Sequence, residues 1–222
     1  MVDLACGTGA ASLAFAAAGI GVLGIDQSTA MLERARCAAL NAGLPVEWRT
    51  GDLRDFSVDD PVDLVTCFYD GYNYLTEISD LDESFASVWN ALRPGGLFIF
   101  DLNTRAKFGA SWNDLCLVAV DREDLFGVYQ SWFEPETGLS PLILTFFVRT
   151  DDGAWDRFEE EHIERAYPLD EVRSLLTEIG FHVEAMLDYV DRSVRFGGVG
   201  SEHSHRVVFI ARRPVDVAES LP

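Results

Sequence analysis

The sequence predicts an α/β fold in which a doubly wound, mostly parallel seven-stranded sheet carries an antiparallel β insertion after its fifth strand. Three observations support this prediction. Short apolar runs alternate with segments of helical period from residue 2 to residue 101. Strand-like runs between about residues 111 and 165 are joined by turn signals, with no helical segment between them. The alternation of helix and strand then resumes, so we expect residues 1–222 to form a single domain with an insertion at about 111–165.

The first half of the chain supplies five of the seven strands. Apolar runs predict strands over 1–5, 21–26, 45–52, 62–70 and 97–103, and helical segments over 10–19, 28–43 and 79–96 lie in three of the four intervals between them. Ser28 is the expected N-cap of the second helix and Gly43 lies just past its end. For the third helix, the spacing of Ser79 and Asp82 predicts a capping box. This order of elements is typical of a parallel sheet with crossover helices.

The second half of the chain begins with the insertion and ends with two further strands. The turns "PETG" and "TDDG" join the strand-like runs of the insertion, which therefore pair as antiparallel hairpins. Apolar residues at helical spacing over 169–179, closed by Gly180, predict the last helix. The runs 182–190 and 205–213 are the sixth and seventh strands.

The composition excludes several partners. The 222 residues carry a formal net charge of −20, which disfavours nucleic acid and anionic membrane surfaces because these bind to basic patches. No apolar run approaches the roughly 18 residues that span a bilayer, and the beginning of the chain lacks the basic segment of a signal peptide. The cysteines are scattered without a CxxC pair, so no metal site is expected. We expect a cytoplasmic protein whose oligomeric state the sequence leaves open.

The glycine-rich stretch "DLACGTGAAS" predicts a cofactor site. Gly7 and Gly9 lie between a strand and a helix, where a backbone without side chains lets a ligand approach the main-chain N–H groups. A dinucleotide fingerprint requires a third glycine, but Ser12 stands at that position. Asp3 also lies in a strand that is normally apolar in nicotinamide-binding proteins. Asp26, at the end of the second strand, suits the ribose hydroxyls of either cofactor class.

Four segments in this order resemble the motifs of the class I S-adenosylmethionine-dependent methyltransferases, over nearly the whole chain. They are "VDLACGTG", "GIDQSTAML", "TGDLRDF" and "LRPGGLFIFD". The resemblance implies a Rossmann-like methyltransferase fold, S-adenosylmethionine as the cofactor and a small-molecule acceptor, because the insertion is similar to that of enzymes acting on sugar amines and other metabolites. The cofactor-binding residues that it implies are Asp3, Ala5, Gly7, Gly9, Asp26, Gln27, Met31, Asp52, Leu53 and Phe68.

The implied reaction is an in-line displacement from a sulfonium, so catalysis depends on alignment, exclusion of water and a base for a protonated nucleophile. We select Tyr69, Tyr72 and His162 as candidate catalytic residues. In an extended strand, Phe158, Glu160, His162 and Glu164 share one face, and an imidazole can accept a proton near neutral pH. The alternative interpretation of His162 is that it is structural.

The resemblance is incomplete at the N-terminus. Only Met1 and Val2 precede Asp3, whereas the family's first strand normally follows one or two helices that cover the cofactor. We therefore expect that the N-terminal helices are missing from the chain as written and that its activity depends on them. The principal hypothesis is a methyltransferase acting on an amine or hydroxyl of a small molecule. The alternatives are a non-catalytic S-adenosylmethionine-binding subunit or sensor, and a nicotinamide-dependent oxidoreductase.

Overall fold

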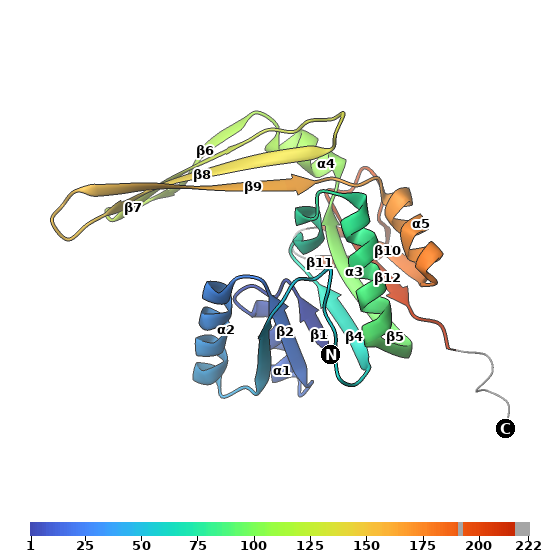
Figure 1. The fold of residues 1–222 in the computed structure, drawn as a ribbon. Helices are drawn as coiled ribbons and strands as arrows, with labels where there is room; N and C mark the ends of the chain where they lie inside the picture. Colours follow the sequence, from blue (N-terminus) through green and yellow to red (C-terminus); the bar gives the residue numbers. More distant parts are fainter. Residues whose placement is uncertain (191–192, 216–222) are drawn as a thin grey trace, which may run out of the picture.

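The computed structural model describes residues 1–190 and 193–215, which form two sheets with flanking helices (Figure 1). The main sheet has the strand order β3-β2-β1-β4-β5-β12-β10-β11. Its parallel half consists of β1 (Val2–Leu4), β2 (Val22–Asp26), β3 (Val46–Thr50), β4 (Val62–Cys67) and β5 (Leu92–Asn103). Its antiparallel half consists of β12 (Arg206–Arg212), β10 (His182–Val190) and β11 (Ser193–Val199). The seven predicted strands are confirmed, and β11 adds an eighth at the edge.

Helices cover both faces of the main sheet. The longer ones are α1 (Ala10–Ala17), α2 (Thr29–Ala42), α3 (Ile78–Ala91) and α5 (Leu169–Ile179), and α3 and α5 lie side by side in Figure 1. Neighbouring residues of a strand point to opposite faces. In β4, Thr66 donates a hydrogen bond to Asp3, which also accepts one from Ser12 of α1, whereas Val65 lies in the apolar cluster that contains Phe85 of α3. The doubly wound arrangement is therefore confirmed.

Three of the four helix ends with a sequence signal follow that signal. The Ser28 hydroxyl accepts a hydrogen bond from the Met31 N–H at 3.3 Å, and Gly43 ends α2 in the left-handed region at φ 66°. Gly180 ends α5 in the same way at φ 118°. The capping box at Ser79 is wrong, because α3 already begins at Ile78, a residue that packs against the core cluster.

The main core lies between the sheet and the helices α3 and α5, and a group of aromatic rings lies within it. Phe85, Phe98, Phe100 and Phe209 are fully buried, and the rings of Phe98 and Phe100 stack at 4.5 Å between centroids. Contact between offset or edge-on rings adds to the free energy gained from burying their apolar area. This core makes the central strands a rigid support for the residues at their ends.

The insertion forms a separate four-stranded sheet, which we call the second sheet. It follows two short helical turns, α4 (Arg105–Lys107) and η2 (Phe108–Trp112). Its antiparallel strands, in spatial order, are β6 (Leu115–Asp121), β7 (Leu125–Ser131), β8 (Leu139–Arg149) and β9 (Trp155–Arg165). In Figure 1 it extends as a long arm from the end of β5, which confirms the antiparallel insertion after the fifth strand.

The side-chain amide of Asn73 links the two sheets. Asn73 lies in the short helical turn η1 (Gly71–Tyr74) that follows β4. Its Nδ2 donates to the carbonyl oxygens of Asn103, at the end of β5, and Arg165, at the end of β9, at 3.0 and 2.8 Å. Because Asn73 is buried, these bonds lose little to competing water. The end of β9 is thereby held beside the carboxyl ends of the central strands. No helix in the described residues is long and apolar enough to cross a membrane.

Candidate active site

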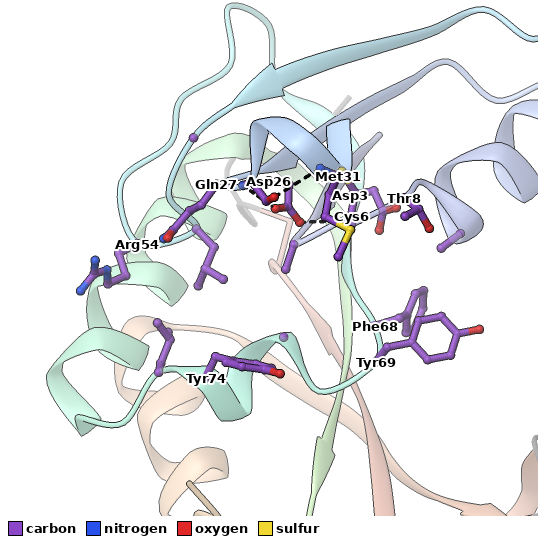
Figure 2. Close-up of a pocket in the computed structure, with 18 of the residues that line it drawn as sticks. Asp3, Cys6, Thr8, Asp26, Gln27, Met31, Arg54, Phe68, Tyr69 and Tyr74 are labelled. Carbon is purple, nitrogen blue, oxygen red and sulfur yellow. Dashed lines mark hydrogen bonds between the residues drawn. The ribbon is translucent and has the colours of Figure 1, made fainter. Parts of the chain in front are cut away.

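A cavity of about 820 Å³ opens at the carboxyl ends of the parallel strands, where open α/β sheets bind ligands (Figure 2). Its volume suits a ligand of nucleoside size. The segments after β1, β2, β3 and β4 all contribute to its wall, and His162 of β9 contributes from the second sheet. Of the predicted cofactor residues, those that line it are Asp3, Ala5, Gly7, Asp26, Gln27, Met31, Leu53 and Phe68.

The turn between β1 and α1 presents bare backbone to the cavity. Gly7 has φ 56°, in the left-handed region that favours glycine, and a Cβ built on it would meet no atom within 4 Å. Any side chain at this position would therefore project into the space that a ligand needs. Its N–H donates to Asp26 Oδ2 at 2.7 Å, which fixes the turn against the end of β2.

Gly9 packs against neighbouring elements behind the cavity. It does not belong to the cavity lining, and a Cβ on it would overlap the indole of Trp48 and lie 3.2 Å from the Cβ of Ala35. With φ 83°, it also precedes α1 in a conformation that L-residues rarely adopt. This glycine allows α1, α2 and β3 to pack closely.

Asp3 and Ser12, the two residues that disfavour a dinucleotide-binding site, form a hydrogen bond with each other. Asp3 is 2% exposed and accepts hydrogen bonds from Ser12 Oγ at 2.5 Å and Thr66 Oγ1 at 2.8 Å. Burial raises the pKa of the Asp3 carboxyl, and the two hydroxyl donors oppose that rise. Ser12 therefore has a structural partner at the position where a dinucleotide-binding protein carries its third glycine.

Asp26 is placed to hold a diol. Its Oδ1 and Oδ2 accept the N–H groups of Ser28 and Gly7 at 2.8 and 2.7 Å, and each oxygen retains a lone pair for another donor. Met31, on the adjoining turn of α2, is 43% exposed and forms an apolar wall of the cavity beside it (Figure 2). The arrangement offers acceptors for two hydroxyls next to a surface on which a flat apolar ring can lie.

The placement of Asp52 differs from the prediction. Its carboxylate accepts from the Arg54 main-chain N–H at 2.9 Å and from Arg54 Nη2 at 2.6 Å, and these bonds lower the pKa of Asp52. Asp52 is not among the lining residues, whereas its neighbours Leu53 and Arg54 are. Sequence reasoning missed Arg54, which also lies 3.5 Å from Asp80 of α3, another lining residue. The sequence feature that could have indicated Arg54 is the segment "DLR", in which Asp52 and Arg54 stand two residues apart and can form an ion pair.

The loop after β4 is held in a strained conformation at the cavity. Tyr69 and Asp70 have φ values of 63° and 61°, which cost roughly 1–2 kcal/mol per non-glycine residue. The Asp101 carboxylate, at the end of β5, accepts both of their N–H groups at 3.0 and 2.8 Å and thereby stabilises the turn. Phe68 and Tyr69 consequently line the cavity, and Tyr69 is 66% exposed.

Tyr72 is not a cavity residue, so its selection as a catalytic candidate is corrected. It is fully buried, its ring contacts Phe85, Phe98 and Phe100, and its hydroxyl lies 3.0 Å from Ser84 Oγ. The short helical turn η1 points Tyr72 into the core and Tyr74 into the cavity. Tyr74 is therefore the tyrosine of η1 that reaches the site (Figure 2).

The second sheet contributes His162 to the site. Tyr74 Oη lies 3.2 Å from His162 Nδ1, so the hydroxyl orients the imidazole. His162 Nε2 is buried without a hydrogen-bond partner within the described residues, and its nearest carboxylate, Glu160 Oε2, is 3.7 Å away. An imidazole nitrogen in this state can accept a proton from a bound molecule or hydrogen-bond to it.

Comparison with known proteins identifies the family. A family model described as a methyltransferase domain matches residues 1–96. A provisionally named methyltransferase of Geobacillus sp. (strain WCH70) is 31% identical over 217 residues, which cover 96% of this chain and 84% of the relative. The crystal structure of an S-adenosylmethionine-dependent methyltransferase from Clostridium acetobutylicum superposes with a TM-score of 0.83 at 27% identity, over 96% of this chain and 83% of that one. The chain belongs to the S-adenosylmethionine-dependent methyltransferases.

The methyltransferase fold extends to more distant structures. An amino pentose methyltransferase from Micromonospora echinaspora, solved with S-adenosylmethionine bound, has a TM-score of 0.73 at 21% identity, over 96% of this chain and 82% of that one. This likeness concerns the fold. The family assignment makes the chain a class I methyltransferase enzyme, and it decides against a non-catalytic binding subunit and a nicotinamide-dependent oxidoreductase.

The cavity fits the methyltransferase's cofactor, S-adenosylmethionine. The open space over Gly7 admits an unbranched chain, Asp26 offers acceptors for ribose hydroxyls, and Met31 provides an apolar surface for a flat base. These features of the cavity do not depend on the comparison with other proteins, and they match the parts of the cofactor that the family uses.

Proposed function

We propose that this methyltransferase transfers a methyl group to an amine or hydroxyl of a small molecule that binds between the loop after β4 and the second sheet. One observation carries the proposal: His162 of β9 and Tyr69 of the β4 loop line the same cavity as Gly7 and Asp26. The acceptor site and the cofactor site are thus parts of a single space. The amino pentose methyltransferase that shares this fold supports an acceptor of the same size class.

Each group of residues has a definite task in this proposal. The turn at Gly7, the carboxylate of Asp26 and the side chains of Met31 and Leu53 bind the cofactor. The bound cofactor supplies an electrophilic methyl group on a sulfonium. Phe68 and Tyr69 align the acceptor, and His162 Nε2 takes up the proton that an amine or hydroxyl loses. The second sheet reduces the access of water at this end of the cavity.

The acidity of the protein supports a small acceptor over a polyanion. Because the protein has a net charge of −20, it would repel a nucleic acid that approached it. A compact acceptor that enters the cavity avoids most of that surface, because water and salt screen charges beyond about 10 Å.

The test is S-adenosylhomocysteine production across a panel of small amines and hydroxyl compounds, with single-stranded DNA, RNA and an unfolded protein as macromolecular controls. The proposal requires turnover with at least one small molecule and background rates with the controls. Turnover with a macromolecular control alone, or with no member of the panel, would refute it.

A further inference from the structure

Glu164 is a buried carboxyl with few partners. It lies in β9 on the same strand face as His162, two residues away, and is 2% exposed. In the described residues one hydrogen bond reaches it, from Asn103 Nδ2 to Oε2 at 3.4 Å, which is long for a carboxylate acceptor. A buried carboxylate normally has a cation or several strong donors around it, because its desolvation is costly.

The nearby arginine is already engaged by other groups. Arg206 of β12 contacts Asp70 Oδ1 at 3.1 Å and Asp101 Oδ2 at 3.3 Å, and its Nε donates to Asn103 Oδ1 at 3.1 Å. Its guanidinium therefore reaches Glu164 only through the amide of Asn103. Burial and the charge of Asp70 raise the pKa of Glu164 to about 8, and the hydrogen bond from Asn103 and the charges of Arg206 and Lys107 offset only part of that rise.

Aromatic side chains complete the surroundings of this carboxyl. Tyr129 of β7 pairs in register with Leu144, which pairs with Glu160, so Tyr129 lies on the face of the second sheet that carries His162 and Glu164. Its hydroxyl is buried without a hydrogen-bond partner in the described part of the chain. Tyr74 reaches the same face, because its hydroxyl lies 3.2 Å from Nδ1 of His162, whose side chain shares that face with Glu164.

Resting on the proposed function, we propose that Glu164, together with Tyr129 and Tyr74, forms a subsite that binds a protonated amino group of the acceptor. A carboxylate flanked by phenol rings is suited to an alkylammonium ion, which gains both the ion pair and the attraction of the ring faces. A phosphate or carboxylate would instead face Asp70, Glu160 and Glu164 together. The subsite adjoins the cavity at Tyr74 and His162, which line it. The acceptor class is therefore amine-bearing and not anionic.

Cation binding at this subsite has a measurable consequence. A cation next to Glu164 favours its charged form, so a carboxyl that is mostly protonated near pH 7 gives up its proton as the amine binds. The proton goes to the buffer, and its uptake contributes to the observed heat. A neutral hydroxyl compound of the same shape causes no such release.

The experiment is calorimetric titration of the protein, saturated with S-adenosylhomocysteine, with isosteric pairs that differ only in an ammonium for a hydroxyl. Cyclohexylamine and cyclohexanol, and glucosamine and glucose, are suitable probes. Measurements at pH 7 in buffers of different ionisation enthalpy give the number of protons released. In at least one pair, we expect the amine to bind at least tenfold more tightly than the hydroxyl compound and to release close to one proton per molecule bound. The Glu164→Gln variant should lose both effects, and Glu161→Gln, an exposed change on the opposite face of β9, should retain them.

Three outcomes would overturn the inference. They are equal affinities for the amine and the hydroxyl compound in every pair, no binding of any amine at millimolar concentration, or a preference for the amine that is unchanged in Glu164→Gln. If Glu164→Gln does not fold, Tyr129→Leu provides the second test, since loss of the ring should reduce the amine preference several-fold. Turnover confined to neutral acceptors and insensitive to Glu164 would refute the subsite while leaving the proposed function intact. Absence of turnover with every small molecule would instead refute the proposed function.

Discussion

Asp26 carries the most direct prediction about the cofactor. Charge-assisted hydrogen bonds to ribose hydroxyls contribute roughly 1.5–3 kcal/mol each. Asp26→Ala should therefore weaken S-adenosylmethionine binding at least tenfold by calorimetry. The same carboxylate holds the N–H groups of Gly7 and Ser28, so circular dichroism must show that the variant is folded. Glu33→Ala, an exposed change on α2, serves as the control, and unchanged affinity in folded Asp26→Ala would remove Asp26 from the site.

His162 is tested by separating turnover from binding. Loss of a general base costs roughly 10²–10⁴ in rate. We expect His162→Asn to lower kcat by that factor with little change in cofactor affinity, because the imidazole reaches the cavity from the second sheet, where we propose that the acceptor binds. Ile163→Ala alters the other face of β9 and should leave kcat nearly unchanged. A variant with normal turnover per folded molecule and a reduced melting temperature would show that His162 is structural.

Glu164 predicts a pH dependence of stability. Burial raises its pKa in the folded protein to about 8, above its value in the unfolded chain, so the charged form destabilises the fold. That cost is absent below about pH 4, grows as the pH rises towards 8 and is complete above it. Glu164→Gln should therefore gain melting temperature relative to the wild type between pH 5 and pH 8. A difference in melting temperature that is the same at both pH values would contradict this assignment.

At the scale of elements, the turn between β1 and α1 combines two glycines with separate functions. Gly7→Val should abolish S-adenosylmethionine binding with a moderate loss of stability, because its side chain would enter the cavity. Gly9→Val should lower the melting temperature much further, because it adds a clash with Trp48 to the same backbone strain. Thermal unfolding and calorimetry on both variants test this division, and equal losses of stability would show that the turn acts as one structural unit.

The elements themselves were largely predictable from the sequence, and the site was predictable in part. The hydrophobic periodicity and the turn residues predicted the strands and the antiparallel insertion, because both depend on the local order of residues. The exchange of Tyr72 for Tyr74 arises from η1, whose turn decides which tyrosine faces the core. The role of Gly9 depends on Trp48, about forty residues away in the chain, and no local pattern indicates that contact. Sequence reasoning therefore fails where a residue's role depends on a distant neighbour.

At the scale of the whole molecule, the site exists because two sheets meet. The main sheet supplies the cofactor cavity at its strand ends, and Asn73 holds the end of β9 against it. His162 of β9 and Tyr74 of η1, the turn that follows β4, form a further hydrogen bond across this junction. In the proposed function, acceptor specificity therefore depends on the second sheet, whereas cofactor binding depends on the main sheet.

A crystal structure of the protein with S-adenosylhomocysteine tests this account most directly. We predict density for the ligand in the cavity, with its ribose hydroxyls within hydrogen-bond distance of Asp26, its amino-acid chain over Gly7 and its base against Met31 and Leu53. The sulfur should lie on the side of the cavity formed by Phe68, Tyr69 and His162. Density in another place, or a ligand whose sulfur lies away from the second sheet, would contradict it.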